Sequence, residues 1–282
     1  MEHRVVAVVD KIKILQPIPG VAVDENTIWN NILNNAIVNK HSPIAGLRYS
    51  QIAVQDSYRS ALAFLITTTL QSNEFPYTAL FEPIHEALDD AIIKSSLFDL
   101  QKIVDGDPAA KTESGEPNYL HPFAWFQGFQ ALEAYRVAHK FYKNIDQHTG
   151  FALEHITFKA LSADIHPAAR IGHYVQFDHL SGLVIGETAV IGDGTYILHG
   201  VTLGGRGDQP GDRHPKIGND VVIGAGAKII GNIYVGDGVW IGANSTVTKS
   251  VPAHKTVTGA KAEVRGDSPA RRAELEKEGS GI

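Results

Sequence analysis

Apolar residues recur at intervals of three and four between about residue 26 and residue 153. This spacing places them on one face of an α-helix, so the segment is predicted to form amphipathic helices that pack together. We therefore predict an all-helical domain over residues 23–158, preceded by an N-terminal extension of residues 1–22. Two apolar sets show the spacing: Trp29, Ile32, Leu33, Ala36 and Ile37, and Ile84, Ala87, Leu88, Ala91 and Ile92.

After residue 158 the apolar period changes to six, which fits neither a helix nor a single strand. Such a period indicates an internal repeat. An aliphatic side chain at every sixth position can stack on its equivalents in neighbouring coils of a solenoid. The rule is followed in three runs: Ile165, Ile171 and Phe177, then Ile185, Ile191, Ile197 and Leu203, and then Ile217, Ile223, Ile229, Val235, Ile241 and Val247.

Glycine often follows the aliphatic residue, as in Ile171-Gly172 and Ile223-Gly224, and it relieves crowding where a chain turns between short flat faces. The repeat resembles that of the hexapeptide family, whose members are left-handed parallel β-helices. The resemblance implies an α+β chain in which the N-terminal all-helical domain is followed by a left-handed parallel β-helix of hexapeptide repeats over residues 159–264. Residues 265–282 are polar and charged and are predicted to form a flexible C-terminal tail.

The six-residue rhythm is interrupted twice. Between Phe177 and Ile185 the spacing is eight, and between Leu203 and Ile217 it is fourteen, which leaves a glycine-rich and charged loop at residues 204–215. An excursion from a regular solenoid adds nothing to its core. We therefore predict that both interruptions serve binding or catalysis.

Composition narrows the classes of partner and of chemistry. With 31 acidic and 25 basic residues the net charge is −6, which argues against binding to nucleic acid or to an anionic membrane surface. The absence of cysteine excludes disulfides, thiolate metal sites and a cysteine nucleophile. The apolar stretches are shorter than the roughly 20 residues of a membrane span, and the first ten residues lack the long apolar core of a signal peptide. A cytoplasmic protein is therefore expected.

One motif, Asp178-His179, lies at the first interruption, and another, Asp212-Arg213-His214-Pro215-Lys216, lies at the second. Together they resemble motifs of the serine acetyltransferase family. Many acyltransferases share the six-residue repeat, but few share both the Asp-His and the Asp-Arg-His-Pro-Lys insertions. The resemblance runs from about residue 24 to residue 264 and implies transfer of acetyl from acetyl-CoA to the hydroxyl of L-serine, in cysteine biosynthesis. The matching positions are 107–109, 128–129, 131–136, 164–172, 178–179, 182, 184–191, 201–205, 211–217 and 223–229.

The resemblance implies that His179 is the general base and that Asp164 orients it. The chemistry is consistent with these roles, because a serine hydroxyl is a weak nucleophile and a free imidazole, with a pKa of about 6.5, can take its proton during attack on a thioester. A carboxylate on the second ring nitrogen would fix the tautomer and stabilise the imidazolium.

L-Serine is a zwitterion, so its site needs a cation and an anion. The resemblance implies that Arg213 binds the carboxylate, a task for which its planar fork is suited, with His214 as a second donor. Asp178 and Asp107 match the family's acidic residues around the amino group, and Asp107 would reach over from the helical domain.

Acetyl-CoA is expected along the later coils as the co-substrate, and no metal is expected. Gly205, Ala225 and Ala243 match family positions at which small residues let the pantetheine arm approach the backbone. Tight packing at the corners of the coils explains small residues equally well. Trp240 and the segment 259–261 depart from the family pattern, at the end of the solenoid where cofactor contacts are expected.

The family also implies partners. A terminal isoleucine after a glycine-rich stretch inserts into the active site of O-acetylserine sulfhydrylase in this family, and Ile282 stands in that position. Such a residue offers an aliphatic side chain beside a free carboxylate, which mimics an amino-acid substrate. A homotrimer or a dimer of trimers, and feedback inhibition by L-cysteine, are further implications.

Three alternatives stay open at this point. Another hexapeptide acyltransferase, acting on a sugar or an antibiotic, leaves Asp107 and the 212–214 motif unexplained. A zinc lyase like the γ-type carbonic anhydrases would draw three ligands from His166, His173, His179, His199 and His214, although the Asp-His pairing suits a base better. A catalytically inactive scaffold that binds a partner through Ile282 is disfavoured by the intact Asp164 and His179.

Overall fold

The computed structural model describes residue 18, residues 20–207 and residues 210–259, and its N-terminal half is helical as predicted. Asp24 caps the first helix by accepting a 2.9 Å hydrogen bond from the Thr27 amide. Within the described ranges, no helix has the length and the apolar character needed to cross a membrane. The helices are α2 (Glu25–Asn39), α3 (Ala45–Ala53), α4 (Tyr58–Leu70), α5 (Tyr77–Ala87), α6 (Asp90–Gly106), α7 (Leu120–Trp125), α8 (Gln127–Lys140) and α9 (Gln147–Leu161), with a 3₁₀ turn η1 (Pro108–Ala110) and a π-helical turn η2 (Phe141–Ile145).

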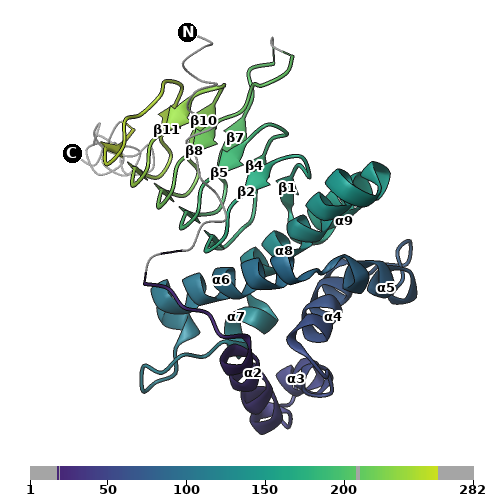
Figure 1. Cartoon of the computed structure of the whole chain (residues 1–282). Helices are drawn as coiled ribbons and strands as arrows, with labels where there is room; N and C mark the ends of the chain where they lie inside the picture. The colour runs from purple at the N-terminus through teal and green to yellow at the C-terminus, as the bar shows by residue number, and fades with distance from the viewer. Residues whose placement is uncertain (1–17, 19, 208–209, 260–282) are drawn as a thin grey trace, which may run out of the picture.

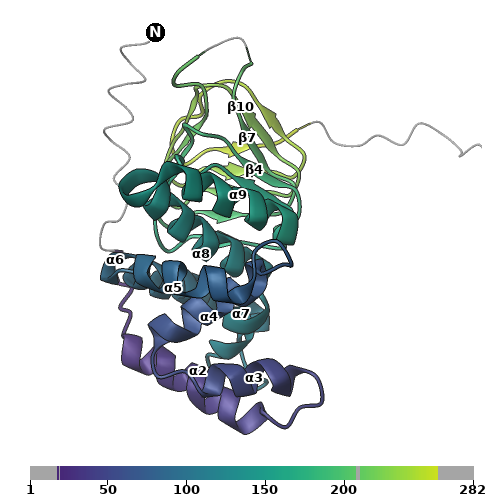
Figure 2. The ribbon, with the colours of Figure 1, turned by 90° about the vertical axis from the view of Figure 1, so that its right-hand side faces the viewer.

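The C-terminal half is a parallel β-helix of short strands, stacked beyond α8 and α9 while α2 and α3 lie at the far end of the molecule (Figure 1, Figure 2). Its three sheets run β1-β4-β7-β10-β13, β2-β5-β8-β11 and β3-β6-β9-β12-β14. The strands are β1 (Ala163–Ile165), β2 (Arg170–Ile171), β3 (Gln176–Phe177), β4 (Leu183–Ile185), β5 (Val190–Ile191), β6 (Tyr196–Ile197), β7 (Thr202–Gly204), β8 (Lys216–Ile217), β9 (Val222–Ile223), β10 (Lys228–Ile230), β11 (Tyr234–Val235), β12 (Trp240–Ile241), β13 (Thr246–Val247) and β14 (Thr256–Val257).

The predicted aliphatic positions form the core of this β-helix. None of them is more than 5% exposed, and each lies in register with its equivalent one coil away. One such column, in the first sheet, runs through Ile165, Ile185, Leu203, Ile229 and Val247. The fold class inferred from the period of six is therefore confirmed. The domain boundary predicted after residue 158 falls inside α9, which continues to Leu161 because that side chain packs into the solenoid core.

Helix α8 belongs to both domains. Phe129 and Val137 join the core of the helical domain, whereas Leu132 and Tyr135 join that of the β-helix. The start of α8 touches β3 so closely that a Cβ on Gly128 would lie 1.8 Å from the Phe177 carbonyl oxygen. Only glycine permits this approach, so the two domains are packed without a linker.

A buried ion pair joins the helices to the first coil. Arg136 of α8 donates from Nε to Asp99 Oδ2 of α6 at 2.8 Å and from Nη2 to the Gly172 carbonyl oxygen at 2.8 Å. The Val175 amide donates to the other oxygen of Asp99 at 2.9 Å. The two charged side chains are 6% and 0% exposed, so each depends on the other for its compensation.

The carboxyl group of Glu133 lies beside this ion pair, further from Arg136 than the carboxylate of Asp99 is. Its Oε1 is 3.8 Å from Arg136 Nε, and neither carboxyl oxygen has a hydrogen-bond partner among the described residues. Burial, followed by the charge of Asp99, raises the pKa of Glu133 well above its usual range. Burial therefore favours the neutral form of Glu133, whereas the hydrogen bonds from Arg136 and the Val175 amide favour the charged form of Asp99.

Replacing Asp99 should destabilise the protein strongly. Asp99→Asn removes the carboxylate that is hydrogen-bonded to Arg136 and leaves only the more distant carboxyl group of Glu133 beside it, which is expected to cost about 3 kcal/mol or more of the free energy of unfolding. The matched control is Asp90→Asn, since Asp90 pairs with Arg59 at the surface and should have a far smaller effect. Urea denaturation measures both variants, and equal losses would contradict the role given to the buried pair.

Candidate functional site

The two interruptions of the repeat lie on two different long edges of the β-helix. The first edge follows β3, β6, β9 and β12, and we call it the His179 edge. The second follows β1, β4, β7 and β10, and we call it the Arg213 edge. The face that carries β1, β4, β7, β10 and β13 separates them, with strands of about three residues, or about 10 Å.

The first interruption projects His179 from its edge. His179 and Leu180 have φ angles of 57° and 60°, in the left-handed region that side chains rarely adopt except at functional or tightly constrained positions. The His179 side chain is 71% exposed, and its Nε2 lies 3.6 Å from Asp178 Oδ2. The ring of His199, one coil further on, meets the His179 ring edge-on at 5.8 Å.

Asp178 is fixed from the neighbouring coil and is joined by an acid from the helical domain. The Tyr196 hydroxyl donates to Asp178 Oδ2 at 2.5 Å. Asp107 follows α6 and accepts a hydrogen bond from the Ala109 amide at 2.9 Å. Burial, followed by the effects of Asp178 and then Asp107, raises the pKa of Tyr196, so both carboxylates act on the same hydroxyl. Asp107, Asp178 and His179 therefore belong to one cluster.

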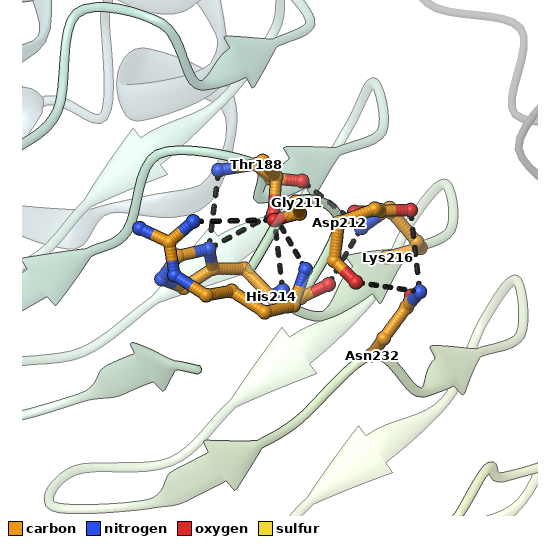
Figure 3. Close-up of polar contacts among 7 residues, drawn as sticks. Thr188, Gly211, Asp212, His214, Lys216 and Asn232 are labelled. Carbon is orange, nitrogen blue, oxygen red and sulfur yellow. Dashed lines mark hydrogen bonds and ion pairs between the residues drawn. The ribbon is translucent and has the colours of Figure 1, made fainter. Parts of the chain in front are cut away.

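The second interruption is anchored by a buried lysine. Lys216 is 2% exposed, and its Nζ donates to the Thr188 carbonyl oxygen at 3.0 Å, to Asp212 Oδ1 at 2.6 Å and to the His214 carbonyl oxygen at 2.6 Å (Figure 3). Asn232 of the next coil donates to the Asp212 carbonyl and carboxylate oxygens at 3.1 and 3.2 Å. The end of the loop is thus tied to the solenoid by polar contacts.

His214 and Arg213 are held by Thr188. The Thr188 Oγ1 accepts hydrogen bonds from the main-chain amides of Arg213 and His214, both at 3.1 Å. Burial, followed by the positive charges of Arg213 and Lys216, lowers the pKa of His214. The Arg213 guanidinium donates to Glu187 Oε2 at 2.7 Å and to the Gly211 carbonyl oxygen at 3.1 Å, which leaves further N–H groups of its fork for a ligand.

Asp164 lies with this second cluster. It occupies β1, at the start of the face between the two edges. Burial, followed by the charge of Asp164, raises the pKa of Glu154 to about 7, and Asp164 also acts on His166, which interacts in turn with Glu187. Among the described residues of one chain, no hydrogen bond or ion pair joins Asp164 to His179.

The small residues predicted to contact the cofactor lie on both edges. Ala225 and Ala243 follow His199 in successive coils of the His179 edge, as the hydrogen bonds from the Gly226 amide to His199 and from the Asn244 amide to Ala225 establish. Gly205 lies on the Arg213 edge, where a Cβ would meet Arg213 Cγ at 2.9 Å and His214 Nε2 at 3.2 Å.

Comparison with known proteins identifies the family. Residues 28–134 match the model of the serine acetyltransferase N-terminal domain, and residues 214–249 match the bacterial transferase hexapeptide model of six repeats. The Escherichia coli (strain K12) serine acetyltransferase is 38% identical over 261 residues, which cover 90% of this chain and 93% of that protein. The chain belongs to the serine acetyltransferase family.

Other members of the serine acetyltransferase family support this. The Arabidopsis thaliana chloroplastic serine acetyltransferase 1 is 41% identical over 86% of this chain and 77% of its own length. The Neisseria gonorrhoeae serine acetyltransferase, solved in complex with serine, matches with a TM-score of 0.77 at 38% identity and covers 84% of this chain and 97% of that one. Solved serine acetyltransferases at 36% identity also include complexes with cysteine and with CoA.

The described part of this serine acetyltransferase family member contains cavities at several places, and they differ in their distance from the two clusters. A cavity of about 660 Å³ lies between α6, α8 and the first coil and is lined by none of the predicted site residues. A cavity of about 210 Å³ adjoins Asp164 and Glu154, and one of about 360 Å³ adjoins Thr188 and Asp212. In the described part of the chain, no group of three or more His, Asp or Glu side chains is arranged to hold a metal ion.

Several functional contacts were not predicted from the sequence. Three residues interact with predicted site residues: Tyr196 with Asp178, Thr188 with Arg213, and Glu154 with Asp164. Tyr196 stands at an outward-facing strand position, where any residue satisfies the repeat. The pairing in register of Gln176 with Tyr196 is the signal that places Tyr196 beside the Asp178 turn.

Glu154 should make stability depend on pH near neutrality. With a pKa of about 7 in the folded chain against about 4.5 when unfolded, the folded state retains a proton that the unfolded state releases between these values. The stability contributed by this group is thus fully present below about pH 4.5 and is lost as the pH rises through 7. Glu154→Gln removes this loss.

The test compares melting temperatures of parent and Glu154→Gln at pH 5.0 and pH 8.0. The variant should gain stability relative to the parent at pH 8.0. A difference that is the same at both pH values would contradict the assignment.

Proposed function

We propose that this chain is a serine O-acetyltransferase, which transfers acetyl from acetyl-CoA to the hydroxyl of L-serine and yields O-acetyl-L-serine and CoA. The proposal is carried by two clusters in a chain of this family: Arg213 with His214, which can bind an anion, and Asp107 with Asp178, which lie beside an exposed histidine and can bind a cation. An α-amino acid presents the matching carboxylate and ammonium groups.

In the proposed mechanism His179 takes the proton from the serine hydroxyl as its oxygen attacks the carbonyl carbon of the thioester. The tetrahedral intermediate then collapses, the carbon–sulfur bond breaks, and the CoA sulfur receives the proton from the imidazolium. No covalent intermediate on the protein is needed, and the chain has no cysteine to form one. Arg213 and His214 bind the serine carboxylate, while Asp178 and Asp107 bind its ammonium group.

We further propose that the two clusters meet between neighbouring subunits of a trimer. The His179 edge and the Arg213 edge lie on opposite sides of one face, so one chain presents two different halves of a site. A threefold rotation brings the His179 edge of each subunit against the Arg213 edge of the next, and such a heterologous contact closes into a ring. Asp164, on the Arg213 side, would then orient His179 of its neighbour.

Acetyl-CoA would lie in the cleft between these two edges. Ala225 and Ala243 continue the line of His179 along the solenoid, with about 5 Å between coils. Gly205 would face them from the Arg213 edge of the neighbouring subunit. All three predicted small residues then border the same cleft.

Other family properties extend the proposal. L-Cysteine differs from L-serine at one atom and would occupy the same carboxylate and ammonium groups, as an inhibitor. Pairing of trimers through the helical domains is supported by exposed apolar residues at the α2–α3 end, namely Val38, Ile44, Leu47 and Val54. Ile282 lies outside the described residues; binding of O-acetylserine sulfhydrylase through it is tested by deleting that residue. A cytoplasmic location also stays a prediction.

Removal of the base should abolish most of the turnover. We expect thiol release from acetyl-CoA to require L-serine, with little response to L-homoserine or to sugars, and to fall by about 10²-fold or more in His179→Ala. His199→Ala, which changes the neighbouring exposed histidine, is the control and should lose far less. Equal turnover of His179→Ala and the parent would refute His179 as the base.

Mixed oligomers test the shared site. Neither His179→Ala nor Arg213→Ala should be active alone, but an equal, randomly assembled mixture of the two should regain on the order of a quarter of parent turnover, because a random neighbour pair combines the two intact halves at that frequency. A mixture of His179→Ala and Asp178→Asn, which damage the same half, should regain none. Absence of recovery in the first mixture would place both halves within one subunit.

A further inference from the structure

The imidazole of His214 has one nitrogen whose hydrogen-bonding role is fixed by the main chain. The Thr188 amide donates to His214 Nδ1 at 3.2 Å, and Thr188 Oγ1 lies 2.9 Å from the same atom. A main-chain N–H can only donate, so Nδ1 must be the acceptor and carries no proton. In a neutral ring the proton then resides on Nε2.

The surroundings keep this ring neutral and hold it in place. His214 is 6% exposed, and its burial and the nearby cations lower its pKa. Its Nε2 lies close to two glycines. A Cβ on Gly186 would lie 2.0 Å from that atom, and a Cβ on Gly205 would lie 3.2 Å from it. The ring therefore packs directly against both glycines, and its only N–H is at Nε2.

The Thr188 hydroxyl is fully used in this arrangement. A hydroxyl has one proton to donate and two lone pairs to accept with. Its proton serves His214 Nδ1, and its lone pairs serve the amides of Arg213 and His214. One side chain thus fixes the ring of His214 and the backbone from which the Arg213 fork extends.

The ammonium group of Lys216 also supports the position of Arg213 and His214. Its ammonium group has three protons and three acceptors, on Thr188, Asp212 and His214. It links the turn that carries Thr188 to the end of the loop, and Asn232 holds Asp212 from the next coil. Both segments that place the Arg213 and His214 side chains are therefore anchored to one buried charge (Figure 3).

We infer that Thr188 is a positioning residue that holds His214 in the Nε2–H tautomer, with Lys216 behind it, so that an imidazole N–H and the Arg213 guanidinium bind one substrate carboxylate. This inference rests on the proposed function for the identity of the carboxylate. It assigns to Thr188 a part in amino-acid binding that its place in a solenoid turn does not require. A threonine that only shaped the turn would affect both substrates alike.

The first test reads the tautomer in the folded parent protein. In a ¹⁵N spectrum of histidine-labelled protein at pH 7.5, His214 is expected to show an unprotonated Nδ1 and a protonated Nε2, with His214→Gln identifying the signals. The opposite tautomer, or a ring protonated on both nitrogens, would overturn the inference. This readout needs neither turnover nor a Thr188 variant, so it stands apart from the proposed reaction.

The second test compares isosteric variants by steady-state kinetics. Thr188→Val keeps the shape and loses the hydroxyl, and we expect the KM for L-serine to rise about tenfold or more while the KM for acetyl-CoA changes by less than about twofold, because three hydrogen bonds are lost on the carboxylate side only. Thr188→Ser keeps the hydroxyl and should stay within about threefold of the parent. Equal rises in both KM values, or no rise, would overturn the inference.

Lysine variants make a matched pair for the same assay. Lys216→Met should raise the KM for L-serine in the same selective way, whereas Lys228→Met, at an exposed lysine that bonds only its own turn, should not. An unchanged KM for L-serine in Lys216→Met would remove Lys216 from the proposal. If the parent shows no serine-dependent turnover at all, the proposed function fails, and the tautomer measurement still decides the role of Thr188.

Discussion

The stacking of inward aliphatic side chains from coil to coil is the constraint on which the β-helix depends. Each coil has a fixed circumference, because Ile185 must lie over Ile165 and Leu203 over Ile185. Extra residues cannot enter a face without moving a whole column out of register. They can be accommodated only where the chain turns, so the edges are the places at which this fold can add chemistry without loss of its core.

The chemistry accordingly divides between two edges, and the physical character of each half differs. The His179 half is open, with a largely exposed imidazole and a carboxylate tied to Tyr196. In the Arg213 half, the loop is held in place by hydrogen bonds from Lys216 to Asp212 and from the His214 amide to Thr188. In the proposed mechanism, the group that exchanges protons needs access, whereas the groups that bind a charge benefit from rigidity, and the proposed trimer would bring these two environments together.

The sequence predicts the elements that repeat or that carry a motif, and it misses the contacts that depend on register. Ile171 and Ile217 could be placed in the core because both follow the six-residue rule. Tyr196 beside Asp178, and Thr188 beside His214, meet across coils separated by 18 and 26 residues, where only the length of each insertion decides which side chains coincide. The separation of Asp164 from His179 within one chain depends on the same geometry.

The length of helix α6 sets the distance between its contact with the first coil and Asp107. Asp99 is held to the first coil through Arg136 and Val175. Asp107 is the residue directly after the helix, eight positions later and about 12 Å along the axis at 1.5 Å per residue. Insertion of a single residue between them would rotate Asp107 by about 100° around the helix axis. The length of this segment is therefore as constrained as the chemistry of its end, and natural variation in chain length should fall elsewhere in the helical domain.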